Sequence, residues 1–180
     1  MTPVQQMLVD LLKTRGKVSG EIVKVDTFLN HLVDIEFIKA VGEAIAYNFK
    51  NIDIDKIITV EASGIIPAQA AAFYMDCDFV YAKKKKPVTM ANYYSASSFS
   101  FTKNEETNLY VSKEVIERGD RLLFVDDFYA RGHTLRAMES LAEEAGAKIV
   151  GKAVVIDKQG RDDIFSILTL CEIKKIFGLI

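Results

Sequence analysis

Two adjacent aspartates, Asp126 and Asp127, are the strongest candidates in this chain for catalytic or ligand-binding side chains. They follow four apolar residues, 122–125, which predict a buried strand, and they precede a short loop, residues 130–134, that opens a helix. In an open parallel sheet, ligands bind beyond the carboxyl ends of the strands. A loop that feeds a helix N-terminus offers N–H groups and a positive dipole to a phosphate. The spacing therefore predicts acids beside a phosphate-binding loop.

This combination of acids and phosphate loop narrows the class of ligand. It suits neither a dinucleotide site nor a P-loop, but it suits a ligand whose vicinal hydroxyls lie one sugar away from its phosphate. A phosphorylated ribose is such a ligand. The alternative is that Asp126 and Asp127 form a solvated cap at the end of an ordinary strand. Spacing alone leaves both interpretations open.

A second loop of the same kind follows the β-branched run at residues 56–60. It consists of Glu61, Ala62, Ser63 and Gly64, and its glycine allows close approach of the backbone to a ligand. If the two strands are neighbours, the two loops can hold two separate phosphate groups.

Four consecutive lysines follow the short strand predicted at residues 79–82. Lys83 and Lys84 lie nearest to the strand end, where they could neutralise the charge that a pyrophosphate leaving group gains. Residues 85–86 are expected on a solvated face.

Alternating strands and helices predict an α/β fold with a mainly parallel, twisted sheet flanked by helices. Helices are predicted over residues 1–15, after the cap Asp34, over 64–75 and over 135–145, and further strands over 21–25 and 150–156. Residues 91–104 suggest a hairpin or a mobile ribbon. The chain is expected to be a single domain, 1–180, in which residues 1–30 and 158–180 lie outside the sheet and contribute a small cap.

Composition excludes several classes of protein. The chain has no apolar run long enough to span a membrane, and its net charge of −2 disfavours binding of nucleic acid through bulk charge. Its two cysteines make neither a disulfide framework nor a metal site. The N-terminal stretch lacks a signal-peptide cleavage pattern, so a cytoplasmic location is expected.

Residues 122–134, LLFVDDFYARGHT, resemble the motif of type I phosphoribosyltransferases that binds 5-phosphoribosyl 1-pyrophosphate (PRPP). That motif is a hydrophobic strand, two acids, two or three apolar residues and a small loop ending in Gly-x-Thr. KVDTFLNH (24–31), VEASGIIPA (60–68), SFSFTK (98–103) and VDDFYARG (125–132) follow the order and spacing of the xanthine-specific branch. The likeness covers residues 20–163.

The resemblance implies the type I phosphoribosyltransferase fold, a homodimer and transfer of phosphoribosyl from PRPP to a purine base. It implies Mg²⁺ held mainly by PRPP and water rather than by a protein cage.

The resemblance also implies a role for individual residues. The implied ribose-binding catalytic residues are Asp126 and Asp127, the second also assisting proton removal from the base. The implied 5′-phosphate loop is Ala130, Arg131, Gly132, His133 and Thr134. The implied pyrophosphate site is Glu61, Ala62, Ser63 and Gly64 with Lys83 and Lys84, whose segment often serves the neighbouring subunit. The implied base contacts are Val23, Asn30, Phe128 and Lys158, and residues 93–103 would be a flexible loop that closes over the site.

Base identity rests on fewer residues than PRPP binding. Lys158 has its own physical rationale, because a cation at a strand end recognises a 6-oxo group and rejects an amino group. The segment after Lys158 is shorter than in the family and has no aromatic residue before Phe165, and Val23 stands where leucine is expected. The resemblance predicts xanthine as the purine substrate, and hypoxanthine, guanine and adenine remain the alternatives. A non-catalytic PRPP sensor that regulates purine genes is the alternative from another class.

Overall fold

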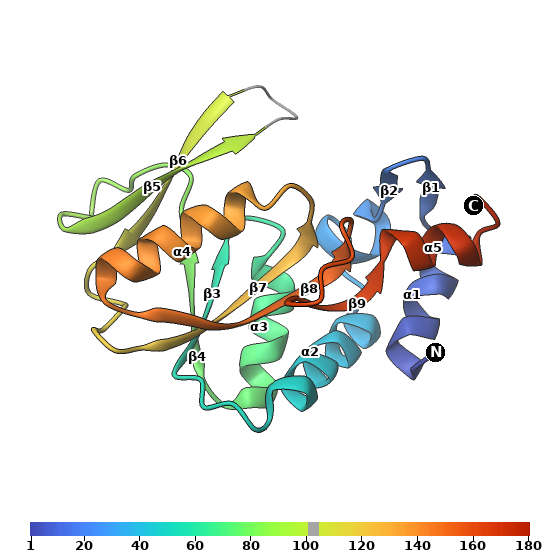
Figure 1. The fold of residues 1–180 in the computed structure, drawn as a ribbon, viewed down its shortest axis with the longest axis horizontal. Helices are drawn as coiled ribbons and strands as arrows, with labels where there is room; N and C mark the ends of the chain where they lie inside the picture. Colours follow the sequence, from blue (N-terminus) through green and yellow to red (C-terminus); the bar gives the residue numbers. More distant parts are fainter. Residues whose placement is uncertain (101–104) are drawn as a thin grey trace.

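A five-stranded parallel sheet forms the centre of the computed structural model, which describes residues 1–100 and 105–180 (Figure 1). Every neighbouring pair of strands in it is parallel. This is the predicted α/β architecture. The strands, in sheet order, are β4 (Asp78–Ala82), β3 (Lys56–Val60), β7 (Arg121–Tyr129), β8 (Lys148–Asp157) and β9 (Phe165–Thr169).

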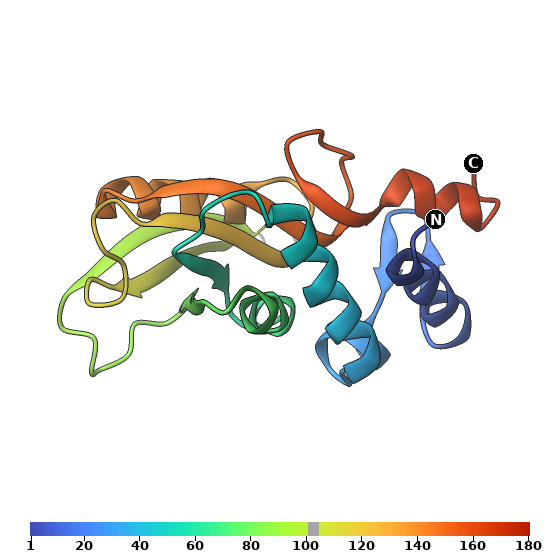
Figure 2. The same cartoon turned by 90° about the horizontal axis from the view of Figure 1, so that it is seen from below.

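Helices cover both faces of this sheet (Figure 2). Helices α2 (Ile35–Phe49) and α3 (Ile65–Met75) pack on one face, and α4 (His133–Ala145) packs on the other. Successive residues of β7 therefore point into different cores: Leu123 lies in the cluster with α2 and α3, and Phe124 lies in the cluster with α4. Burial on both faces explains why this strand has a continuous apolar run.

Strand β7 is longer than predicted. The acids were expected just after the strand, but its ladder with β8 continues through Asp126, which pairs with Val154, to Tyr129, which pairs with Asp157. Polar residues break the apolar pattern without ending the hydrogen bonding, because the neighbouring strand still supplies partners. The acids consequently lie in extended backbone, within the hydrogen-bonded ladder near the carboxyl end of the strand.

The terminal segments gather at one end of the sheet (Figure 1). They comprise α1 (Pro3–Thr14), the β1–β2 hairpin (Lys17–Ser19 and Ile22–Lys24), a five-residue π-helix (Asp26–Asn30) and α5 (Leu170–Ile176). Leu8 of α1 and Ile173 of α5 belong to the same buried cluster. The expectation that residues 158–180 lie outside the sheet is wrong for β9, because its apolar residues Ile167 and Leu168 are buried against the sheet's helices.

An antiparallel hairpin, β5 (Tyr93–Ser100) and β6 (Glu105–Ser112), packs beside α4. Lys83 and Tyr110 exchange two backbone hydrogen bonds of 2.9 Å, which attach the hairpin to the end of β4. The hairpin predicted for residues 91–104 is therefore present, but its second strand lies beyond that range, at Glu105–Ser112. Residues 101–104, which include the end of the predicted closing loop 93–103, lie outside the described residues. None of the described helices is both long enough and apolar enough to cross a membrane.

Helix α2 meets α3 at a glycine. A Cβ atom on Gly42 would lie 2.6 Å from the carbonyl carbon and oxygen of Ala70. Alanine normally stabilises a helix by about 0.5–1 kcal/mol relative to glycine, but here backbone blocks the added methyl. We expect Gly42→Ala to lower the free energy of unfolding by about 1–3 kcal/mol in urea denaturation.

The exposed neighbour Glu43 provides the control for this substitution. Glu43→Ala should change the free energy of unfolding by less than about 0.5 kcal/mol. A Gly42→Ala protein as stable as the wild type would contradict the close packing of α2 on α3.

Candidate active site

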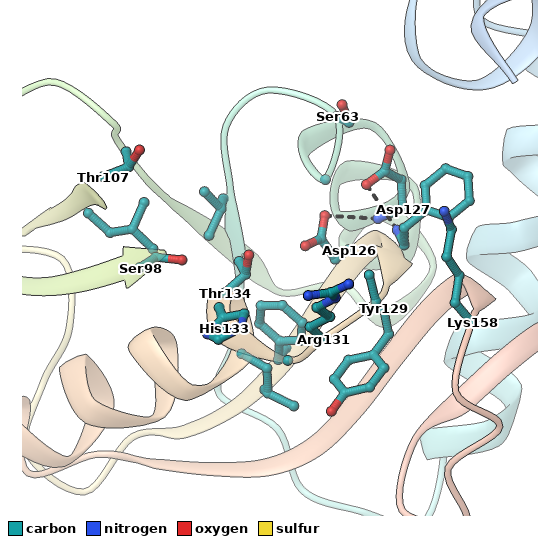
Figure 3. A pocket seen from close by; sticks show the side chains of 18 of the residues that line it. Ser63, Ser98, Thr107, Asp126, Asp127, Tyr129, Arg131, His133, Thr134 and Lys158 are labelled. Atoms are coloured by element: carbon teal, nitrogen blue, oxygen red, sulfur yellow. Dashed lines mark hydrogen bonds between the residues drawn. The ribbon is translucent and has the colours of Figure 1, made fainter. Parts of the chain in front are cut away.

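A pocket of about 610 Å³ lies at the carboxyl end of the parallel sheet. Its walls come from the segments that follow β3, β4, β7 and β8, together with parts of the β5–β6 hairpin and the β1–β2 turn. Figure 3 shows Asp126 and Asp127 in the middle of the pocket, Lys158 at one end, and Ser98 and Thr107 of the hairpin at the other. The topology thus brings together loops that are distant in sequence.

Most of the residues predicted from the sequence line this pocket. Loops 61–64 and 130–134 are neighbours, because β3 and β7 are adjacent strands. The predicted residues that line the pocket are Glu61, Ala62, Ser63, Gly64, Lys84, Asp126, Asp127, Phe128, Ala130, Arg131, Gly132, His133, Thr134 and Lys158.

Three predicted residues do not line the pocket. Val23 is buried in the hydrophobic cluster that the terminal segments share with α2 and α3, because its side chain points inward from β2. The Lys83 side chain lies over Tyr81 and its Nζ is 3.4 Å from the Tyr81 hydroxyl. Asn30 reaches the site indirectly: its Nδ2 donates a 3.2 Å hydrogen bond to Oδ2 of Asp127.

Other lining residues were not predicted individually. Ser98 belongs to the segment 93–103 that was expected to close over the site, and Thr107, directly opposite it across the β5–β6 hairpin, was not expected there. Glu21 enters from the turn between β1 and β2. The turn residues Gly20 and Glu21 were the available sequence signal for that contact. The remaining unpredicted lining residues are Val60, Leu109, Phe124, Tyr129, Leu135, Gln159 and Leu170.

The two acids are fixed by backbone hydrogen bonds. Oδ1 of Asp126 accepts from the amide of Asp127, and Oδ1 of Asp127 accepts from the amide of Phe128, both at 2.9 Å (Figure 3). Burial, reinforced by the negative charge of Asp127, raises the pKa of Asp126 well above its usual range, whereas Lys84 opposes this shift. The ligand-free pocket therefore favours a neutral Asp126.

Glycines allow both loops to pack closely, one against Asp126 and the other against Tyr129. A Cβ on Gly64 would lie 2.2 Å from Oγ1 of Thr59 and 2.6 Å from Oδ1 of Asp126. Gly132, in the left-handed conformation at φ +75°, precedes α4, and a Cβ there would lie 2.5 Å from the Tyr129 hydroxyl. A larger residue at Gly64 would push the N-terminus of α3 away from Asp126, and one at Gly132 would push the N-terminus of α4 away from Tyr129.

Side chains brace the loops around the acids. The guanidinium of Arg136 donates to the carbonyl oxygen of Arg131 at 3.2 Å and lies 3.0 Å from Nδ1 of His133. Since a guanidinium can only donate, His133 accepts through Nδ1 and carries its proton on Nε2. Glu61 accepts a 2.6 Å hydrogen bond from the amide of Lys84, which joins the loops that follow β3 and β4.

The Lys158 end of the pocket is shaped by a turn that the buried side chain of Asp157 holds in place. The carboxylate of Asp157 accepts hydrogen bonds from the amides of Gln159 and Arg161, at 2.7 and 2.6 Å. Nζ of Lys158 donates to the carbonyl oxygen of Glu21 at 2.9 Å and lies 5.3 Å from the ring centroid of Phe128. A cation and an aromatic ring therefore face the same part of the pocket.

Residues 30–164 match the family model described as a phosphoribosyl transferase domain. The chain belongs to the phosphoribosyltransferase family. It is 41% identical over 159 residues to a xanthine phosphoribosyltransferase of Bacillus cereus, covering 87% of this chain and 81% of that protein. A protein of the same name from Bacillus thuringiensis (strain Al Hakam) is 40% identical with the same coverage.

Solved phosphoribosyltransferases share the fold. The adenine phosphoribosyltransferase of Rhodothermus marinus DSM 4252 superimposes with a TM-score of 0.72 at 23% identity, covering 92% of this chain and 99% of that one. The enzyme of the same name from Thermoanaerobacter pseudethanolicus ATCC 33223 gives a TM-score of 0.75 at 22% identity, covering 90% and 99%. The predicted type I phosphoribosyltransferase fold is therefore confirmed.

The raised pKa of Asp126 predicts a pH-dependent stability of this ligand-free phosphoribosyltransferase. In the unfolded chain the carboxyl ionises near its ordinary pKa of about 3.9. As the pH rises from there through the higher pKa of the folded state, the unfolded state gains more from ionisation, and folding stability is lost. Asp126→Asn removes this titration. Urea denaturation should show that the variant is more stable than the wild type at about pH 7, with the difference shrinking toward pH 4.

The exposed Asp162 serves as the matched control. Asp162→Asn should follow the wild-type stability at every pH to within about 0.5 kcal/mol. Parallel pH profiles for Asp126→Asn and the wild type would show that Asp126 is ionised in the ligand-free pocket, contrary to this account.

Proposed function

We propose that this phosphoribosyltransferase transfers the 5-phosphoribosyl group of PRPP to xanthine and releases pyrophosphate. The main support for this proposal is the arrangement of one pocket. Loops 61–64 and 130–134, which follow the adjacent strands β3 and β7, lie on either side of Asp126 and Asp127. This arrangement matches a ligand with a phosphate at each end of a ribose. The relatives that are 40–41% identical are named for xanthine.

PRPP would lie across the carboxyl end of the sheet. Loop 130–134 and the N-terminus of α4 would bind the 5′-phosphate, because the first N–H groups of a helix point outward and carry partial positive charge. Loop 61–64 and Lys84 would bind the pyrophosphate. Asp126 and Asp127 would accept hydrogen bonds from the ribose hydroxyls between the two loops.

The acids would also stabilise the transition state. Breaking the bond to pyrophosphate leaves positive charge on the ribosyl ring and adds negative charge to the leaving group. Carboxylates beside the ring and Lys84 beside the leaving group favour that separation. Asp127, held by Asn30, would also assist removal of the proton from the purine nitrogen. Catalysis would consist mostly of positioning and electrostatic stabilisation.

The base would occupy the Lys158 end of the pocket. The Phe128 ring supplies an apolar face, and Lys158 supplies a donor for the exocyclic oxygen of a 6-oxopurine. Phe128 would thereby take the place of the aromatic residue missing after Lys158. An amino group at the same position of the purine would meet another donor, which disfavours adenine.

Mg²⁺ is compatible with this donor set. Among the residues that the structure describes, no group of three or more His, Cys, Asp or Glu side chains could form a metal cage. Mg²⁺ keeps several waters and needs few protein ligands, so PRPP oxygens would supply most of its coordination, and Asp126 and Asp127 are the carboxylates nearest the ribose. When bound, the ion would neutralise charge on the pyrophosphate.

We further propose a cytoplasmic homodimer. Lys83 does not line the pocket of its own chain, and its backbone is fixed by the hairpin. A second subunit would give Lys83 a role at the neighbouring pyrophosphate site, as the sequence resemblance implies. Light scattering that shows a single monomeric species would contradict this arrangement.

Pyrophosphate release in the presence of PRPP and Mg²⁺ tests the proposed function. Xanthine, hypoxanthine, guanine and adenine are supplied separately, and xanthine is expected to give the highest kcat/KM. A preference for another base would keep the reaction and overturn the assignment of xanthine. PRPP binding by calorimetry without turnover of any of the four bases would instead support a sensor.

Lys158→Gln tests the base site. We expect kcat/KM for xanthine to fall about tenfold to a hundredfold, the cost of losing a hydrogen bond to a charged group, while PRPP affinity measured by calorimetry stays close to that of the wild type. The exposed Lys175→Gln on α5 makes the same change of charge and should leave kcat/KM unaltered. Equal kcat/KM values in Lys158→Gln and the wild type would exclude Lys158 from base recognition.

A further inference from the structure

Thr59, on β3, has a buried hydroxyl without a hydrogen-bond partner. Its side chain is fully buried, and its Oγ1 is the one buried side-chain polar atom without a partner among the described residues. Leaving a buried hydroxyl unpaired costs about 1–3 kcal/mol. Valine has nearly the same shape and would avoid this cost, so folding alone does not account for threonine here.

The unpaired hydroxyl lies next to the catalytic acid pair. A single carbon added to Gly64 would overlap both Oγ1 of Thr59, at 2.2 Å, and Oδ1 of Asp126, at 2.6 Å. The gap between the two oxygens is therefore no wider than one heavy atom. A small movement of either side chain brings the hydroxyl within hydrogen-bonding distance of the carboxyl.

The proposed reaction requires a different protonation state of Asp126 from the one that the ligand-free pocket favours, and therefore different hydrogen-bond partners. In the ligand-free pocket, burial and the charge of Asp127 favour the neutral acid. The proposed role at the ribose requires a carboxylate that faces developing positive charge. Once ionised, this carboxylate needs donors, and it already accepts from one amide, that of Asp127. A hydrogen bond from a hydroxyl to a carboxylate is charge-assisted and about twice as strong as a neutral one.

We propose that Thr59 is a positioning residue that donates its hydroxyl hydrogen bond to ionised Asp126 when PRPP is bound, and remains unpaired in the ligand-free protein. The proton lost by Asp126 passes to solvent as PRPP enters. This inference rests on the proposed function, since it requires PRPP in the pocket. Thr59 acts through Asp126 and does not itself touch the substrate.

Several other charged groups surround Asp126 and must be kept constant in any test. Asp127 adjoins it on the same strand, and Lys84 acts on it from the end of β4. The other charged or titratable side chains that line the pocket are Glu21, Glu61, Tyr129, Arg131, His133 and Lys158. Substitution of Thr59 leaves all of them in place.

Calorimetry of PRPP binding with Mg²⁺ tests the proposal without requiring turnover. Titrations in buffers of different ionisation enthalpy give the number of protons released on binding. At about pH 7, Thr59→Val should release fewer protons than the wild type and bind PRPP about tenfold more weakly, the cost of losing a hydrogen bond to a charged group. Thr59→Ser keeps the hydroxyl and should restore both quantities toward wild type.

The melting temperature of the ligand-free protein separates this role from a structural one. Thr59→Val removes an unpaired buried hydroxyl, so it should melt at the same temperature as the wild type or higher. A lower melting temperature, or wild-type proton release and affinity in Thr59→Val, would overturn the proposal. Failure of the wild type itself to bind PRPP would refute the proposed function, and this inference with it.

Discussion

The confinement of two neighbouring carboxylates within one buried strand is the constraint on which the rest of this structure depends. The charged form of Asp126 is disfavoured, because burial raises the pKa of this carboxyl and the negative charge of neighbouring Asp127 raises it further. The fold limits this cost by giving each carboxylate a backbone donor, by holding Asp127 with Asn30 and by placing Lys84 nearby. A ligand that donates hydroxyl hydrogen bonds to these carboxylates, and that develops positive charge on its sugar ring during the reaction, would offset the remaining cost.

The parallel sheet makes this arrangement possible. Because β3 and β7 are neighbours that run in the same direction, the loops after them end at the same edge and flank the acids. Gly64 then lets the N-terminus of α3 approach Asp126, and Gly132 lets the N-terminus of α4 pack against Tyr129, since a Cβ at either position would collide with these residues. In the proposed mechanism, phosphate binding and charge separation would therefore depend on the same local packing. The Arg136 contact to the loop before α4 and the Glu61 contact to Lys84 hold both loops in place.

The sequence predicted those parts of the fold that depend on local patterns. Periodic apolar residues located α1, α2 and the strands at residues 56–60 and 150–156, and Asp34 caps α2 as expected, accepting a hydrogen bond from the amide of Phe37. The PRPP-like motif located most of the pocket, because its residues are contiguous in the chain. Features that depend on pairing between distant segments were missed. The extent of β7 is set by β8, the meeting of Ser98 with Thr107 is set by hairpin register, and the inward direction of Val23 is set by the β1–β2 pair. The partnerless hydroxyl of Thr59 likewise has no local signal in a β-branched strand.

The protonation state of Asp126 is the most direct test of this account. Carboxyl ¹³C chemical shifts of the ligand-free protein, with Asp126 assigned by comparison with Asp126→Asn, report that state through a pH titration. The account predicts that Asp126 stays protonated well above the ordinary aspartate range of about pH 4 and that saturating PRPP with Mg²⁺ converts it to the carboxylate. The central claim is that Asp126 is neutral in the ligand-free pocket and becomes ionised when PRPP binds. A ligand-free Asp126 that titrates near pH 4, with no change on addition of PRPP, would contradict it.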